Sequence, residues 1–354
     1  MSNSYAPGEK GGGALDGVVH NRIAHSLFRR VSRAIRDQED FRVIVVVPVH
    51  MYGQGDLLTN PGLPPVVHYQ ALTVFKGPQS LLRRLAAAHP DCDDLSRYIF
   101  FACLRAHCSP GVPPLRRRRE TGRPRETNLL YVHTKLLIAD DRVVICGSAN
   151  INDRSQMGDR DSEVCLMMRT AAGAPGSFAR SLRIRLMAEH CGFLPSCHGD
   201  GPVPNAGGGT AGGGGGGNDG DAVAVSATPV CGDGGCRLCP RVVAHDVAAV
   251  TADVLRDPLA ACAHFVARSV ANTRLYDRVY PGEPHNGMRT LDQYIETRKW
   301  SGVSNLSEQE RRPILRQVKG SAVLWPLHFL ENADLGRTFA SRLASLVGGT
   351  SVFT

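Results

Sequence analysis

Residues 131–168 read YVHTKLLIADDRVVICGSANINDRSQMGDRDSEVCLMM and decide the fold of this 354-residue chain. Leu, Ile and Val dominate positions 129–138, which predicts a buried strand. A turn at 140–142 and a second short strand at 143–146 return the chain to a glycine and a further group of polar residues. The segment therefore predicts a hairpin of two core strands with polar side chains gathered at one end.

The polar residues of this segment follow a fixed spacing that suits chemistry at a phosphodiester. Strand residues two apart share a face, so we expect His133 and Lys135 to point together, and Ser148 and Asn150 to do the same. Lys135 supplies a compact positive charge, and Ser148 and Asn150 supply hydrogen-bond donors for phosphoryl oxygens whose charge grows during displacement. His133 is the candidate for proton transfer or nucleophilic attack, because imidazole titrates near neutral pH. Asp140 follows the turn, and we expect it to hold the loop.

The segment resembles the HKD motif of the phospholipase D superfamily, and GSANINDRSQMGDRDSE is similar to the second HKD motif of eukaryotic phospholipase D. Other segments resemble the C-terminal catalytic lobe of that family in the same order along the chain. They are 21–48, 76–82 and 98–107 before the motif, and 178–185, 271–280 and the closing Thr354 after it. The resemblance therefore covers most of the chain and implies a phospholipase D-like catalytic lobe.

In that family two HKD motifs face each other across one site. One histidine forms a phosphohistidine intermediate and the other protonates the leaving alcohol. His133 corresponds to the second motif, so the resemblance implies a catalytic set of His133 as general acid, Lys135, Asp140, and Glu163 as the carboxylate that orients the histidine. The implied reaction is hydrolysis of phosphatidylcholine to phosphatidate and choline, without a metal or other cofactor.

The chain departs from the family pattern because, of its thirteen histidines, only His133 begins an HxK sequence. Nucleophile and acid must lie on opposite sides of phosphorus, and one histidine cannot be both in one step. We therefore expect a second HKD lobe in trans or a homodimer. Three alternatives stay open: a phospholipase D completed by a partner lobe, a single-motif homodimeric phosphodiesterase acting on nucleic acid, and a catalytically inactive half-enzyme. A missing lobe would leave a large apolar face.

The net charge of +8 suits an anionic partner, either phospholipid headgroups or nucleic acid. The densest basic patch is Arg116, Arg117, Arg118 and Arg119. A solvated loop insertion is the favoured interpretation of this patch, because runs of charge usually have no specific ligand. As a binding surface it lacks the interleaved aromatic residues on which single-stranded nucleic acid stacks, so we favour a phosphatidylcholine membrane surface over nucleic acid. No apolar run approaches the roughly 20 residues needed to span a bilayer, and the first thirty residues lack a signal-peptide core. We expect a cytoplasmic, peripheral membrane protein that is not secreted.

The eleven cysteines favour reduced core thiols over a disulfide framework. One group could supply the ligands of a zinc site: Cys191, Cys197, His198, Cys231, Cys236 and Cys239. The CxxC half-site within it has legitimate spacing, but no second CxxC or HxxxH follows. Incidental loop thiols are the favoured interpretation, and we expect no metal.

The pattern of elements predicts an α/β fold, with a mixed layered sheet flanked by helices. We expect a disordered lead at 1–17, the catalytic lobe at 18–195, a flexible Gly- and Cys-rich insertion at 196–243, and C-terminal helices and a tail at 244–354 that complete the lobe. Helices are predicted at 21–37, 80–89, 178–191, 247–255 and 258–270, and strands at 41–47, 98–104, 129–138, 143–146 and 162–168. We expect a strand or an extended segment at 323–330.

Overall fold

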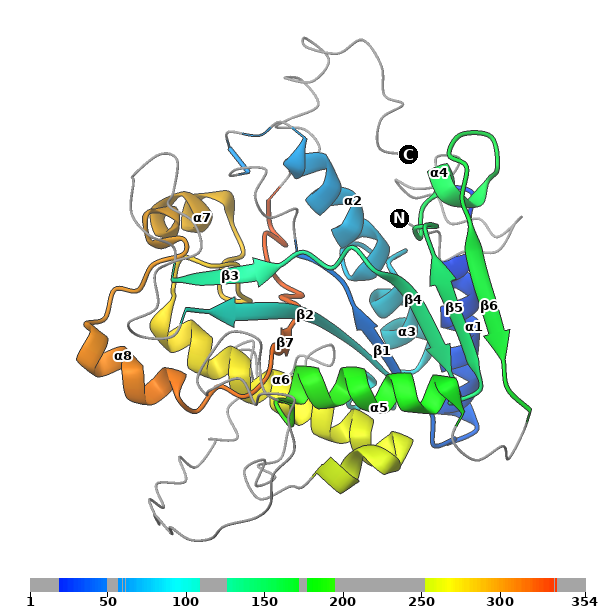
Figure 1. The fold of residues 1–354 in the computed structure, drawn as a ribbon. Helices are drawn as coiled ribbons and strands as arrows, with labels where there is room; N and C mark the ends of the chain where they lie inside the picture. Colours follow the sequence, from blue (N-terminus) through cyan, green and yellow to red (C-terminus); the bar gives the residue numbers. More distant parts are fainter. Residues whose placement is uncertain are drawn as a thin grey trace, which may run out of the picture.

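The computed structural model describes residues 19–49, 57–58, 60, 62–108, 126–171, 177–194, 252–333 and 335. Within these residues the chain is an α/β structure in which helices flank β-sheets, as the sequence predicts (Figure 1). The strands form two sheets, one of four strands and one of three. The predicted lead, the predicted insertion at 196–243 and the four arginines at 116–119 lie outside the described residues.

The larger sheet has four strands, and its central strand is β2. The strands are β1 (Val43–Val46), β2 (Ile99–His107), β3 (Thr127–Leu130) and β7 (Ala322–Leu324). β1 pairs in parallel with the first half of β2, β3 pairs antiparallel with its second half, and β7 pairs antiparallel with its middle. The C-terminal part of the chain thus supplies a strand to the same sheet as the N-terminal part.

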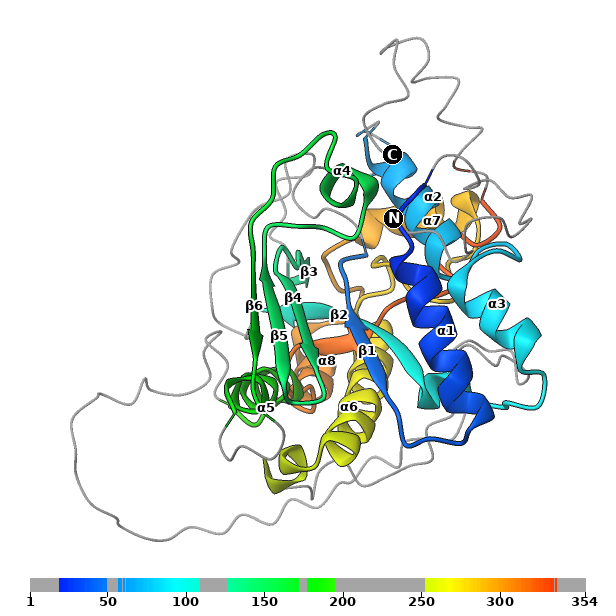
Figure 2. The ribbon, with the colours of Figure 1, turned by 90° about the vertical axis from the view of Figure 1, so that its right-hand side faces the viewer.

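Side-chain alternation along β2 divides the core between its two faces. The surrounding helices are α1 (Ile23–Arg36), α2 (Leu63–Val74), α3 (Leu81–Ala88), α5 (Phe178–Cys191) and α6 (Pro258–Val279). Phe100 and Ala102 pack with Phe265 of α6, whereas Phe101 belongs to the larger cluster that contains Val31 of α1. Figure 2 shows α1 and α3 on one side of β1 and β2, and α5 and α6 on the other.

The smaller sheet consists of three antiparallel strands in the order β4 (Lys135–Ala139), β5 (Val143–Gly147) and β6 (Cys165–Arg169). The short helix α4 (Asp153–Gln156) lies between the last two. The prediction of one buried strand at 129–138 is wrong, because β3 pairs with β2 and β4 pairs with β5. The chain leaves one sheet and enters the other between these strands. His133 therefore precedes β4 and does not share a strand with Lys135.

Several predicted elements are confirmed with small shifts of their ends, including α1, β1, α3, β2, β5, β6 and α5. α6 runs nine residues further than predicted, to Val279. Of the segment 323–330, predicted as a strand or extended segment, the first two residues belong to β7 and a turn follows at 327–330. Of the predicted helix at 247–255 the described part belongs to the 3₁₀ helix η2 (Ala252–Arg256). The remaining described elements are η1 (Leu95–Arg97), α7 (Leu291–Thr297), η3 (Arg298–Trp300) and α8 (Glu308–Leu315).

Candidate active site

An open cleft of about 790 Å³ lies at one end of the smaller sheet. Its walls come from the segment before β4, the end of β5 and the loop that leads into β6. The lining residues are His133, Thr134, Lys135, Cys146, Gly147, Ser148, Asn150, Arg160, Asp161, Ser162 and Glu163. The structure therefore brings together every residue predicted for catalysis or phosphate binding except Asp140. Thr134, Arg160, Asp161 and Ser162 were not predicted, although GDRDSE stands within the quoted motif.

Lys135 and His133 occupy the β4 side of the cleft. Lys135 is the first residue of β4 and lies directly opposite Gly147 of β5. Its ammonium donates a hydrogen bond to the backbone carbonyl of His133, with 2.6 Å between Nζ and the oxygen. The His133 side chain is exposed, and its ring centroid lies 5.8 Å from that of Tyr131. The charge of Lys135 and the imidazole of His133 thus face the same open space, as a phosphoryl site requires.

Gly147 allows β6 to approach β5 closely at the floor of the cleft. A Cβ at this position would lie 2.2 Å from the Val164 carbonyl oxygen and 2.6 Å from the Cys165 Sγ. Gly147 and Cys165 are direct partners across the strands. Only a residue without a side chain fits here, which explains why the motif has glycine immediately before Ser148.

Ser148 and Glu163 form a hydrogen-bonded pair on the β6 side of the cleft. The Ser148 hydroxyl donates to the Glu163 carboxylate and accepts a hydrogen bond from the Val164 backbone N–H at 3.0 Å. The hydrogen bond from Ser148 is the main cause that holds the pKa of Glu163 below its ordinary value. The carboxylate is therefore ionised at neutral pH. Among the described residues it is not bonded to His133, so the predicted pairing of Glu163 with that imidazole is absent here.

Asn150 stands at the mouth of the cleft with its side chain exposed. Its backbone carbonyl accepts a hydrogen bond from the Gln156 side chain at 2.8 Å, so α4 holds this part of the loop. Its amide group faces the same cleft as Lys135 and Ser148. These three side chains can present one ammonium, one amide donor and, once the Ser148 hydroxyl turns away from Glu163, a second neutral donor to a tetrahedral anion.

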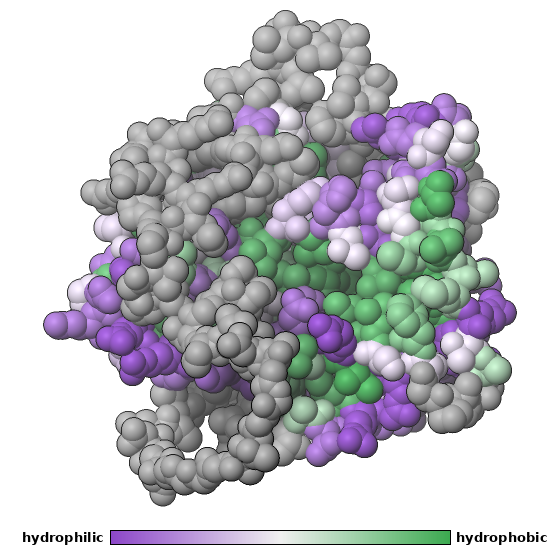
Figure 3. Space-filling view, viewed as in Figure 1, coloured by the Kyte–Doolittle hydropathy of each residue, from purple (hydrophilic) through white to green (hydrophobic). Residues whose placement is uncertain are grey.

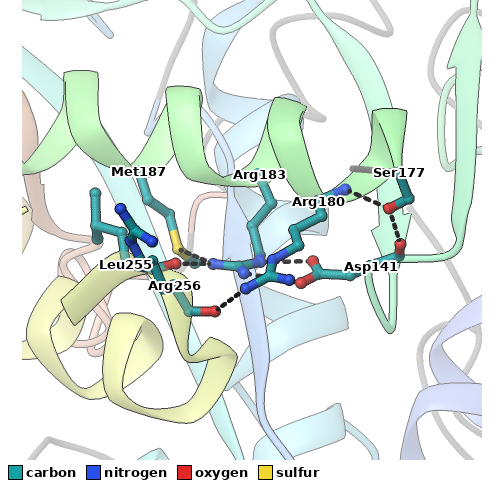
Figure 4. A network of polar contacts seen from close by, with 7 residues as sticks. All are labelled: Asp141, Ser177, Arg180, Arg183, Met187, Leu255 and Arg256. Carbon is teal, nitrogen blue, oxygen red and sulfur yellow. Dashed lines mark hydrogen bonds and ion pairs between the residues drawn. The ribbon is translucent and has the colours of Figure 1, made fainter. Parts of the chain in front are cut away.

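The prediction that Asp140 holds the turn of the hairpin is wrong, because the adjacent Asp141 makes the contacts. The Asp141 carboxylate accepts from Arg183 at 2.6 Å (Nε to Oδ1) and 2.8 Å (Nη2 to Oδ2), and its carbonyl accepts from the Ser177 hydroxyl at 2.5 Å. Figure 4 shows Arg183 reaching down from α5 to this carboxylate and to the Leu255 carbonyl. Asp140 is exposed, and no described residue is hydrogen-bonded to its side chain.

Neither a metal cluster nor a membrane-spanning helix is found in the described residues. In the described residues no group of three or more His, Cys, Asp or Glu side chains is arranged to hold a metal ion. Cys191 is a buried free thiol, and the other five residues considered as zinc ligands lie outside the described residues. Within the same ranges, no helix is both long and apolar enough to cross a bilayer.

Large apolar side chains surround the cleft and remain exposed. All five residues of β6 are exposed. Leu137 and Met167 lie on the same face of the sheet as Lys135, because Leu137 and Met167 are both partners of Ile145, two residues before Gly147. Their exposed fractions are 52% and 62%. Figure 3 shows apolar surface extending over the region of β4, β5 and β6.

The sequence of this chain is similar to a known protein family and to several of its members. Residues 14–203 match the sequence profile of the family described as "Phospholipase D". "Phospholipase D A" of Dictyostelium discoideum is 37% identical over 188 residues, which cover 50% of this chain and 14% of that protein. "Phospholipase D1" of Homo sapiens is 36% identical over 193 residues, covering 51% of this chain and 17% of that protein. "Phospholipase D2" of Bos taurus is 27% identical over 339 residues, 92% of this chain and 29% of that protein. The chain thus spans less than a third of each of these relatives.

Proposed function

Because this chain belongs to the phospholipase D family, we propose that its cleft is one half of a phosphodiesterase site that hydrolyses phosphatidylcholine to phosphatidate and choline. The observation that carries the proposal is the meeting of His133, Lys135, Ser148 and Asn150 in one open cleft. A cation, two neutral donors and an imidazole are the groups that displacement at a phosphodiester requires.

In the proposed reaction a histidine from a second HKD motif attacks phosphorus, and a P–N bond forms as the P–O bond to choline breaks. His133 is the general acid and gives its proton to the departing choline oxygen. In the second step the neutral imidazole of His133 takes a proton from water, which attacks phosphorus and releases the other histidine and phosphatidate. Lys135, Ser148 and Asn150 contact the non-bridging oxygens, where negative charge develops in both steps.

We further propose that the second histidine comes from another polypeptide, either a second HKD lobe in trans or a second copy of this chain. One His133 cannot lie on both sides of the same phosphorus. A partner that covers the cleft face must also cover Leu137 and Met167, which are exposed on that face. Burial of these apolar side chains would favour association, at roughly 25 cal/mol per Å². In this proposal the completed enzyme acts on phosphatidylcholine at a membrane surface.

The test measures choline release from phosphatidylcholine vesicles by the purified chain, with His133→Ala and Lys135→Ala as matched variants whose folding is checked by circular dichroism. Release by the wild type that is lost in both variants supports the proposal, and sedimentation then shows whether the active species is a homodimer. If the wild type alone releases nothing, the assay is repeated with a separate protein that contains the other HKD motif. No release from that mixture would overturn the proposal. Cleavage of bare single-stranded DNA in place of lipid would favour the nuclease alternative.

A further inference from the structure

A buried carboxylate ties the loop of the cleft to the segment before α1. Asp153 is the first residue of α4, and only 1% of its surface is exposed. Its carboxylate accepts three hydrogen bonds: from the His20 backbone N–H at 2.6 Å, from the Asn21 backbone N–H at 2.9 Å, and from the Asn21 side-chain amide at 2.7 Å. Asn21 is itself 6% exposed. The two side chains are 132 residues apart in sequence, so this contact exists only in the folded protein.

On the other side of Asp153, α4 holds two parts of the cleft wall. Gln156, in the last turn of α4, donates to the Asn150 carbonyl at 2.8 Å. The Arg154 carbonyl accepts from the Asp161 backbone N–H at 3.1 Å, and the Arg154 and Asp161 side chains form an ion pair at 3.1 Å. Both Asn150 and Asp161 line the cleft. The position of α4 therefore sets the position of this wall.

The helix α4 cannot fix its own position. It has four residues, which is too short for an isolated helix to be stable in water. Its N-cap Asn152 accepts from the Ser155 N–H at 3.1 Å, a local bond that shapes the turn but does not place it on the protein. The segment before α1 is a firm reference, because α1 is anchored in the core by Val31 and Ala34, both 0% exposed.

We propose that Asn21 and Asp153 are positioning residues, which hold the loop from Ser148 to Glu163 so that Ser148 and Asn150 face the phosphate. The inference rests on the proposed function of the cleft as a phosphate site. The contact acts through the loop and does not touch the substrate. Loss of the contact lets α4 move, and the cleft then presents its donors in many arrangements in place of one.

The pair can be tested by exchanging its two members. Asp153→Asn replaces one of the two accepting oxygens by an NH2 group and removes the charge, so at least one of the three N–H donors loses its acceptor, and Asn21→Asp places a second carboxylate against the first. The double variant Asn21→Asp/Asp153→Asn reverses the donor and acceptor between the side chains and keeps an acceptor for the His20 N–H, so it restores two of the three hydrogen bonds. Asp159→Asn, at an exposed carboxylate in the same loop, is the control for loss of one negative charge near the cleft.

Two measurements follow each variant. Hydrogen exchange with mass spectrometry reports the protection of peptides from 148–163, compared with peptides from β2 and α6. Inorganic phosphate is titrated and observed by ³¹P NMR, with Lys135→Ala as the variant that lacks the cation. We expect both single variants to speed exchange within 148–163 alone and to weaken phosphate binding about tenfold. The double variant should recover most of both, and Asp159→Asn should change neither by more than about twofold.

Unchanged exchange in 148–163 in the single variants would overturn the proposal. Faster exchange in β2 and α6 to the same extent would also overturn it, since Asp153 would then act on global stability. If the wild type itself does not bind phosphate, the proposed function of the cleft fails, while the exchange data still decide whether the pair holds the loop.

Discussion

The ion pair between Asp141 and Arg183 should be a major contribution to the stability of the smaller sheet. The Arg183 guanidinium binds the Asp141 carboxylate in a bidentate manner, through two charge-assisted hydrogen bonds of 2.6 Å and 2.8 Å. The side chains are 10% (Arg183) and 16% (Asp141) exposed. Removing one member of a buried pair leaves the other charge uncompensated and costs about 3–5 kcal/mol. Because some water reaches the pair, we expect Asp141→Asn to lower the free energy of unfolding by about 3 kcal/mol.

Asparagine is a suitable replacement, because the backbone at Asp141 has a φ of 55° and asparagine tolerates this left-handed conformation. Asp140→Asn is the matched control, since Asp140 has a φ of 53° and an exposed side chain. Urea titrations followed by circular dichroism at 222 nm give the free energy for each variant. Arg183→Met and the double variant Asp141→Asn/Arg183→Met complete a cycle, in which we expect a coupling energy of about 2 kcal/mol. Equal effects of the two aspartate variants, or a loss below about 1 kcal/mol for Asp141→Asn, would refute the reasoning.

Gly147→Ala should destabilise the protein by about 3 kcal/mol, because its Cβ would lie 2.2 Å from a backbone oxygen; thermal unfolding that matches the wild type would contradict this. Ser148→Ala should raise the pKa of Glu163 towards its ordinary value, since the lost hydrogen bond is the main cause of its lowering, and a carboxyl NMR titration measures the change. The stability that the lowered pKa confers is present above the unfolded-state pKa and is lost as the pH falls through the folded-state pKa, so this acid sensitivity should be smaller in Ser148→Ala than in the wild type. Iodoacetamide at pH 8 should modify the exposed Cys165 and spare Cys103, whose burial raises the pKa of its thiol to about 12; mass spectrometry of peptides locates the label, and equal labelling would show that β2 opens readily.

The local sequence was sufficient to predict helices whose apolar residues recur at a helical period and strands that are bounded by turns. α1 has apolar residues every fourth position, and the prediction for α5 matches its observed ends. α2 was missed because Pro64 and Pro65 argue against a helix, whereas both lie in its first turn, where proline is tolerated. The starts of α7 and α8 carry capping boxes, from Thr290 and Ser307, so a usable signal was present.

The division between β3 and β4 could not be predicted from the residues involved. Apolar residues stand on both sides of His133, Thr134 and Lys135, and these three polar residues fit either a break between two strands or one continuous strand with a polar face. That point is decided by the pairing partners, β2 and β5, which lie on either side in sequence. Sequence reasoning therefore placed His133 inside a strand, whereas this residue precedes β4 and lines the cleft together with Lys135.

The hydrogen-bond partners of single side chains in and near the site could not be predicted from the sequence either. Asp140 and Asp141 are neighbours of the same type with similar backbone conformation, and only the position of Arg183, 42 residues further on, determines which one holds the turn. The sequence suggested the imidazole of His133 as the hydrogen-bond partner of Glu163. In the fold this carboxylate accepts its hydrogen bond from the Ser148 hydroxyl instead. Asp153 stood inside the quoted motif, but its partner Asn21 comes from the other end of the lobe.

The exposure of β6 bears on the proposal that a partner completes the site. Cys-Leu-Met-Met-Arg shows no alternation of polar and apolar residues, and strands of that kind are normally covered on both faces. In the described chain all five residues are exposed. One of these faces also carries Lys135, because Lys135, Gly147 and Cys165 are partners in consecutive strands. In the proposed function, covering Met167 and placing a second histidine opposite His133 would thus concern the same face of the sheet, and one partner molecule could do both.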